Sequence, residues 1–109
     1  MPTTYKVLGQ SSPTADTDTN LYTVPSATQT VVSTITVCNR SGSIDIFNIA
    51  VRPAGASIAN QHYVFFGEPI GSNSSVILTI GMTIAATDII TVRSLNGSTS
   101  FNAFGSEIS

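Results

Sequence analysis

The side chains that could do chemistry in this chain are few, and they lie far apart in the sequence. There is one cysteine, Cys38, and one histidine, His62. A nucleophilic thiol needs a nearby base, and a disulfide or a thiolate metal site needs further cysteines. Because Cys38 falls on an expected strand in another segment from His62, we interpret it as a small buried or interfacial side chain. His62 begins an apolar run, and we expect it to hydrogen-bond a loop or a neighbouring subunit rather than to transfer protons.

The carboxylates form no recognisable catalytic or metal-binding set. Asp16 and Asp18 in "TADTDTN" loosely resemble a calcium-binding loop, but the central Gly and the bidentate Glu of the EF-hand pattern are missing. Asp88 is expected to end a turn before "IITV". No pair has the character of an acid and a base for glycoside hydrolysis. We therefore predict that the chain is not an enzyme and has no catalytic, cofactor-binding or metal-binding residues.

Three arginines lie at or near the ends of expected strands, in "VCNR", "AVRP" and "ITVR". In a chain with so few charges, Arg40, Arg52 and Arg93 are each expected to be paired. An arginine at a strand end contacts a carboxylate of a partner or reaches loop carbonyls. Structural or interfacial ion pairs are favoured over ligand binding. Together with His62, these arginines are the predicted partner-interface residues.

Uncharged hydroxyl groups dominate the polar surface. The chain has 109 residues, a formal net charge of −2, and 15 Ser and 15 Thr against 10 charged residues. No basic patch is present to neutralise phosphates, and no apolar run is long enough to span a membrane, so neither nucleic acid nor membrane is expected as a partner. Low charge gives little electrostatic protection against association, which favours a homo-oligomer. The N-terminus has no apolar core typical of a signal peptide, which favours synthesis in the cytoplasm.

The arrangement of apolar residues predicts strands rather than helices. In "VVSTITVCN", alternation places Val31, Ile35 and Val37 toward a core and Val32, Thr34, Thr36 and Cys38 on the other face. Asn96-Gly97 suits a tight hairpin, and "NRSGS" joins two further strands. We expect an all-β protein, an antiparallel β-sandwich or jelly-roll-like barrel of about eight short strands. It would form a single domain over residues 1–109, with a flexible loop or arm around residues 10–20. The expected strands contain "TYKVLGQ", "LYTVP", "VVSTITVCN", "IDIFNIAVRP", "QHYVFFG", "SSVILTIGM", "DIITVRSL" and "SFNAFGS".

Four stretches carry a resemblance to a known group of proteins: "LYTVP", "STITVCNR", "IAVRPAGASIANQHY" and the closing "FNAFGSEIS". The chain resembles small virion structural proteins of tailed bacteriophages, particularly cyanophages and other aquatic phages. The likeness runs over nearly its whole length. It implies a compact β domain added to a phage particle, and it supplies no catalytic residues.

The resemblance implies two alternative functions. The first is a capsid decoration or cement protein that binds and stabilises the mature shell, as a homo-oligomer for which a trimer is favoured. Its partners would be the major capsid protein or other virion proteins, and it would be located in the virion after synthesis in the host cytoplasm. The second is a tail, baseplate or fibre component that contributes to assembly or to host-receptor contact. Exposure of Tyr63, Phe65 and Phe66 outside the core would favour glycan contact.

Overall fold

The described part of the chain forms eight strands and two short 3-10 turns. The computed structural model describes residues 2–109. The turns are Pro53–Gly55 (η1) and Asn60–His62 (η2). The strands are β1 (Thr3–Ser11), β2 (Thr19–Thr23), β3 (Gln29–Asn39), β4 (Asp45–Arg52), β5 (Tyr63–Ile70), β6 (Ser75–Ile84), β7 (Ile89–Ser94) and β8 (Thr99–Ile108).

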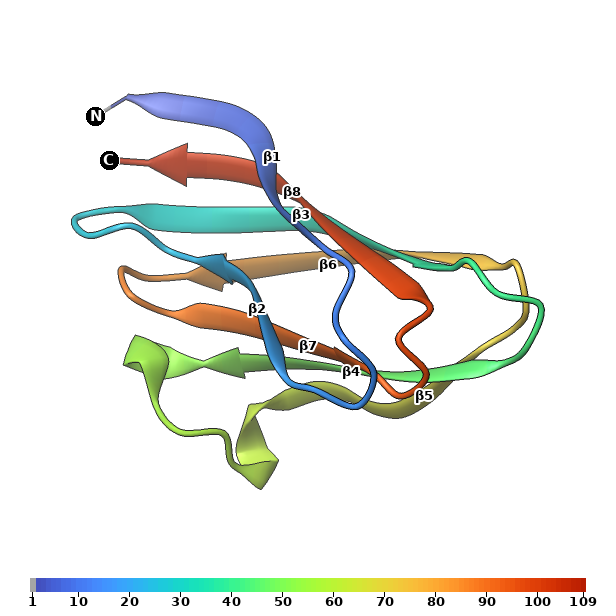
Figure 1. The fold of residues 1–109 in the computed structure, drawn as a ribbon. Helices are drawn as coiled ribbons and strands as arrows, with labels where there is room; N and C mark the ends of the chain where they lie inside the picture. Colours follow the sequence, from blue (N-terminus) through green and yellow to red (C-terminus); the bar gives the residue numbers. More distant parts are fainter. Residues whose placement is uncertain (1) are drawn as a thin grey trace.

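The strands form two antiparallel four-stranded sheets packed face to face (Figure 1). One sheet has the order β1-β8-β3-β6 and the other β2-β7-β4-β5. In the described part of the chain, only the connection from β4 to β5 joins two strands of one sheet. Every other connection crosses between the sheets, which is the winding of a jelly roll. The expected all-β sandwich of eight strands is therefore confirmed. The chain ends lie side by side, with the Ser109 amide donating to the Pro2 carbonyl.

The core fills the space between the inner faces of the sheets. Phe47 of β4 and Phe101 of β8 come from opposite sheets, and their rings meet edge to face with centroids 6.0 Å apart. Val32, Ile35 and Val37 of β3 are fully buried beside them. Edge-to-face packing of two large rings across the sandwich fixes the separation of the sheets.

A β-bulge in β3 changes which of its valines faces the core. The pairing of β3 with β8 shifts between Val32 and Thr34, so that Ser33 is an extra residue relative to β8. Such a bulge reverses the alternation on its N-terminal side. Val32 is buried and Val31 is partly exposed. The predicted faces of Ile35, Val37, Thr34, Thr36 and Cys38 are confirmed, whereas those of Val31 and Val32 were wrong.

The turn at Asn96-Gly97 does not form the predicted hairpin. It connects β7 to β8, which lie in different sheets. Gly97 has a φ of +73°, as expected for a turn glycine, but Asn96 does not have a positive φ. The Asn96 amide instead donates to the buried carboxylate of Asp45 at 2.9 Å. "NRSGS" likewise leads from β3 to β4 across the sandwich, so its flanking strands are not paired with each other.

The segment from residue 12 to 18 is a loop between the sheets, and hydrogen bonds hold its start and its centre. The Asp16 amide donates to the Ser94 carbonyl at 2.8 Å, and Arg40 donates to the Ser12 hydroxyl at 2.8 Å.

Asp88 holds a second loop region, because its carboxylate accepts from the amides of Ala54 and Ala85, each at 2.8 Å. The expectation that Asp88 ends a turn before β7 is confirmed.

Among the described residues, no helix is long and apolar enough to cross a membrane.

Candidate functional site

Arg40 and Arg52 bind loops and neighbouring strands within the chain. Arg52 donates to the Thr91 hydroxyl at 3.0 Å, to the Ala56 carbonyl at 3.0 Å and to the Asn20 side chain at 3.0 Å. It thereby joins β2, β4 and β7 to the loop after η1, which confirms the expectation that an arginine here reaches loop carbonyls. Arg40 is exposed and donates to the hydroxyls of Ser12 and Ser100. Within the described residues, neither arginine forms an ion pair with a carboxylate.

Arg93 and His62 also have partners inside the chain. Arg93 donates to Asp16 through two of its nitrogens, and its third nitrogen lies 3.6 Å from Asp18. The hydrogen bond to Asp16 is the main reason that the pKa of Arg93 lies above its ordinary value. His62 ends η2, just before β5, and its Nδ1 accepts from the Ala59 amide at 3.1 Å. The loop contact expected for His62 is therefore confirmed. A role of these four residues in a partner interface stays a prediction.

Cys38 is half-buried on the outer face of β3. The register pairs it with Ser75 of β6 and Ser100 of β8, so the thiol lies among small side chains. His62 lies just before β5, which is a strand of the other sheet. Within residues 2–109, no group of three or more His, Cys, Asp or Glu side chains is arranged to hold a metal ion.

The structure reveals a buried carboxylate that sequence reasoning did not single out. Asp45 begins β4 and is fully shielded from solvent. Its Oδ1 accepts from the amides of Ile46 and Asn96, and its Oδ2 accepts from three hydroxyls. These hydroxyls belong to Ser94, Ser98 and Thr99. Burial by itself would raise the pKa of Asp45, but the hydrogen bonds to Ser94, Thr99, Asn96 and Ile46 outweigh it and lower the pKa to about 2.

Asn39 extends this buried network to a third connection. It accepts from Ser98 and Ser41, and its amide nitrogen donates to the carbonyls of Ser43 and Gly71 at 2.8 and 3.1 Å. Asp45 and Asn39 together tie the β3–β4, β5–β6 and β7–β8 connections into one end of the sandwich. With every oxygen engaged, this network is structural and not a reaction centre.

Strand β6 is an unprotected sheet edge. The other three edge strands carry features that discourage pairing with another chain: Lys6 in β1, a length of five residues in β2, and Glu68 and Pro69 in β5. β6 has ten residues without a charge or a proline, and no charged residue occurs between Glu68 and Asp88. Its only irregularity is a register shift near Gly81.

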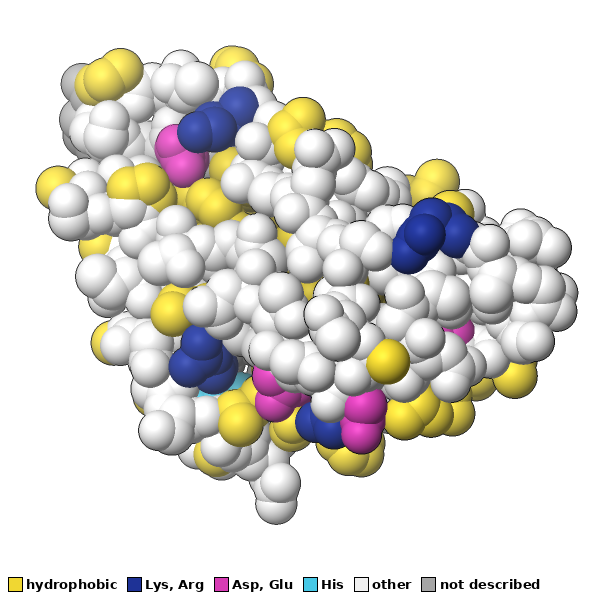
Figure 2. Space-filling model, in the orientation of Figure 1, with side chains coloured by type: hydrophobic (Ala, Val, Ile, Leu, Met, Phe, Trp, Pro, Cys, Tyr) yellow, Lys and Arg dark blue, Asp and Glu magenta, His cyan; other side chains and the backbone are white. Residues whose placement is uncertain are grey.

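The inward face of β6 is apolar and only partly buried, and its outward face is uncharged. The inward side chains Val76, Leu78, Ile80 and Met82 pack against the core but are only partly buried. On the outward face, Ile77 is 70% exposed. Figure 2 shows that little charge is present on the visible side of the molecule, where acidic and basic side chains form small separate groups on a mostly uncharged surface. A long, uncharged, apolar edge is a surface on which another protein chain can pack.

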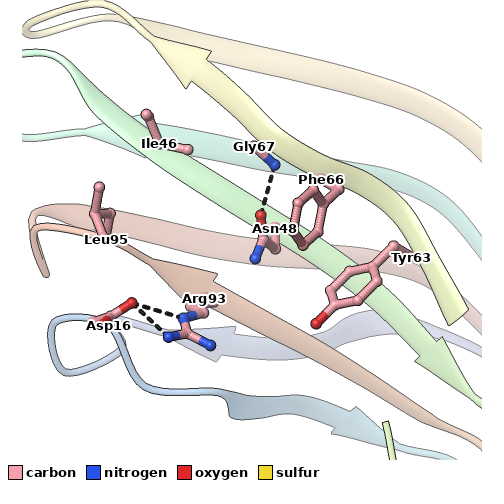
Figure 3. Close-up of a pocket in the computed structure, with 8 residues that line it drawn as sticks. All are labelled: Asp16, Ile46, Asn48, Tyr63, Phe66, Gly67, Arg93 and Leu95. Carbon is pink, nitrogen blue, oxygen red and sulfur yellow. Dashed lines mark hydrogen bonds and ion pairs between the residues drawn. The ribbon is translucent and has the colours of Figure 1, made fainter. Parts of the chain in front are cut away.

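A shallow pocket of about 290 Å³ lies on the outer face of the second sheet, over β5, β4 and β7 (Figure 3). Its aromatic wall is formed by Tyr63 and Phe66, whose rings meet edge to face with centroids 4.8 Å apart. Ile46 and Leu95 line the opposite part, and the ion pair of Arg93 with Asp16 closes one side. Phe66 is 71% exposed, which is unusual for so large an apolar ring.

Two irregularities in β5 bring Tyr63 and Phe66 to the same face. The register with β4 shifts on both sides of Phe65, which points inward and packs against Phe47. Gly67 has a φ of +65°, and its amide donates to the Asn48 side-chain oxygen at 2.7 Å. Simple alternation along "YVFF" would place Tyr63 with Phe65 and opposite to Phe66. Of the three aromatics singled out from the sequence, Tyr63 and Phe66 thus lie outside the core and Phe65 does not.

Comparisons of the sequence with protein-family models and with curated proteins found no match.

Proposed function

We propose that this protein is a structural component of a phage particle, a decoration or cement protein that binds the mature shell and stabilises it. The observation that supports this function best is the unprotected edge of β6, with its ten uncharged residues and only partly buried apolar side chains. In an assembled particle this edge packs against a second protein chain, either another copy or a shell subunit. The resemblance of the sequence to phage virion proteins supports the same function.

The physical role follows from rigidity and from binding preference. Three chain connections are tied together by buried hydrogen bonds at one end of the sandwich, so the domain resists deformation. A domain that bridges neighbouring subunits of an expanded lattice, and has no affinity for free subunits, stabilises that lattice by mass action. An uncharged contact surface makes such binding insensitive to salt.

A tail, baseplate or fibre component is the second candidate. One specific observation favours it, namely the exposed pair of Tyr63 and Phe66 on the outer face of the second sheet. An aromatic surface of this kind suits contact with a ligand on a host cell. The β6 edge would then join copies within a tail assembly.

The decoration function is tested by co-sedimentation of the purified chain with expanded shells, with unexpanded shells and with free shell subunits of the phage that encodes it. We expect saturable binding to expanded shells in a fixed ratio and none to free subunits. Thr79→Lys places a charge on the exposed face of β6, and we expect it to weaken shell binding at least about tenfold, because a buried lysine must lose its hydration.

Thr4→Lys is the matched control for this experiment. Thr4 is exposed on β1, the opposite edge strand of the same sheet, so the two variants make the same chemical change. The control is expected to bind expanded shells as the unmodified chain does. Equal binding of Thr79→Lys and the unmodified chain would show that β6 is not the contact. Lack of binding to any form of the shell would contradict the decoration function itself.

A further inference from the structure

We propose that the pocket formed by Tyr63, Phe66, Asn48 and the Arg93–Asp16 pair is a binding site for a neutral saccharide. This inference concerns the pocket itself, and it holds whether the chain is placed on a shell or in a tail. It rests on three features of the described residues: an exposed aromatic wall, polar groups with unused hydrogen-bonding capacity, and a local charge that excludes acidic sugars.

The aromatic wall supplies the apolar part of the site. Tyr63 and Phe66 are held at an interplanar angle of 73°, which leaves a large part of the Phe66 ring open to solvent. An aromatic ring has a negative electrostatic face. The axial C–H groups of a pyranose are slightly positive and flat enough to stack on such a face. The bulge at Gly67, supported by Asn48, fixes Phe66 in this position before any ligand binds.

The polar side of the pocket offers donors and acceptors for sugar hydroxyls. Asn48 uses its oxygen to accept from the Gly67 amide, so its NH₂ group remains available. The Tyr63 hydroxyl has no hydrogen bond to the rest of residues 2–109, and Asp16 uses only Oδ1 toward Arg93. Figure 3 shows the Asn48, Tyr63, Arg93 and Asp16 side chains arranged around one space. A phenol, an amide and a carboxylate supply both donors and acceptors, as vicinal hydroxyls require.

The local charge selects against acidic sugars and phosphate. Among the described residues, Arg93 is the only cation that lines the pocket, and it already faces the carboxylate of Asp16 in the pocket and that of Asp18 just outside the lining. One positive and two negative groups leave a local charge of −1, so an incoming carboxylate or phosphate would be repelled. The space of about 290 Å³ lies at the lower end of ligand pockets, which suits one or two sugar rings.

A protein partner would use the same exposed rings differently. Protein contacts of useful affinity bury a wide area around a central aromatic anchor. This pocket instead combines a single exposed ring pair with polar groups directed into a small concave space, which favours a small ligand rich in hydroxyls.

The experiment is a titration of the full ¹⁵N-labelled chain with maltose, cellobiose and lactose, each to about 50 mM, followed by amide chemical shifts. At least one of these neutral disaccharides is expected to shift the amides of Asn48, Phe66 and Gly67, with a Kd of ~1–10 mM. Galacturonic acid is expected to bind at least about tenfold more weakly because of charge repulsion.

Three variants define the site. Phe66→Ala is expected to abolish the shifts, and Tyr63→Phe, which removes only a hydroxyl, to weaken binding about three- to tenfold. Tyr5→Ala is the control, because Tyr5 is 83% exposed on β1, in the other sheet, and lies outside the pocket. Since Phe66 is also exposed, both alanine variants are expected to keep their melting temperature.

The proposal is overturned if none of the three disaccharides shifts the pocket amides, or if galacturonic acid binds more tightly than they do. It is also overturned if Phe66→Ala changes the molecular mass in solution while sugars leave the pocket amides unchanged, because the rings would then form a contact between protein chains.

Discussion

Replacing Asp45 with alanine is expected to lower the free energy of unfolding by about 3–5 kcal/mol. The substitution leaves two amides and the hydroxyls of Ser94 and Thr99 without their acceptor, at a position that is fully buried, while Ser98 keeps Asn39 as its acceptor. These donors belong to the β7–β8 connection and to the start of β4, so the loss separates the two sheets at one end. Denaturant unfolding followed by circular dichroism measures the change. Glu68→Ala, at an exposed carboxylate of β5, is the control and is expected to change stability by less than about 0.5 kcal/mol.

Asp45→Asn separates the charge of this residue from its shape. The asparagine oxygen is expected to accept from the Ile46 and Asn96 amides, while its NH₂ group donates to the hydroxyls of Ser98 and Thr99 after these rotate. The hydroxyl protons of Ser94 and Thr99 then lose their acceptor, and the Ser94 oxygen cannot accept from the NH₂ group because it already accepts from the amides of Gly97 and Thr99. We therefore expect a smaller loss than for alanine, about 1–3 kcal/mol.

Asp45→Asn is also expected to make the free energy of unfolding less sensitive to acid. The folded pKa of Asp45 lies at about 2, below the ordinary value of 3.8, so its stabilising effect is nearly complete above about pH 5 and is lost as the pH falls toward 2. This contribution amounts to about 2 kcal/mol. The unmodified chain is expected to lose that much more stability than Asp45→Asn between pH 5 and pH 2. If the free energies of unfolding of the two proteins fell equally between pH 5 and pH 2, the Asp45 carboxylate would not be held by these hydrogen bonds.

Replacing Gly105 with alanine is expected to destabilise the fold by about 3 kcal/mol or more. A Cβ atom at this position would lie 2.0 Å from the Val31 carbonyl oxygen and 3.1 Å from Leu8 Cδ1. Val31 belongs to β3, which is paired on both sides by β6 and β8, so its backbone is not free to move away. Glycine is required here because two strands approach closely beside a bulge.

Gly42→Ala is the matched control for this prediction. A Cβ atom at Gly42 would meet no atom within 4 Å, and the residue does not have a positive φ. We expect its free energy of unfolding to stay within about 0.5 kcal/mol of the unmodified chain. Equal stabilities of the two variants would show that the close approach at Gly105 does not exist in solution.

The strands of this protein were predictable because their apolar residues alternate, and their pairing was not. All eight expected segments are strands, yet the turn at Asn96-Gly97 connects two sheets. A two-residue turn motif specifies a hairpin only where no stronger interaction acts on it. Here the Asn96 amide is held by Asp45, which lies 51 residues away in the sequence. Contacts of this kind leave no local pattern in the chain.

The candidate sites were predictable only in part, for a related reason. Sequence reasoning correctly expected Arg52 to reach loop carbonyls and His62 to bond a loop, because both residues stand at strand ends. It did not place Tyr63 and Phe66 on one face, because the bulges around Phe65 break the alternation. The positive φ of Gly67 causes one of these bulges, and the glycine in "FFG" was the only indication of that bulge in the sequence. Asp45, flanked by Ile44 and Ile46, resembled an ordinary strand residue.

The proposed function depends on the place and abundance of the protein in a particle, so the most direct measurement is its copy number. Quantitative mass spectrometry of purified virions gives this number relative to the major shell protein. The account predicts a fixed ratio to the shell subunit, with copy numbers of the same order as the shell lattice sites. A handful of copies that matches the low symmetry of a tail, or absence from washed particles, would contradict it.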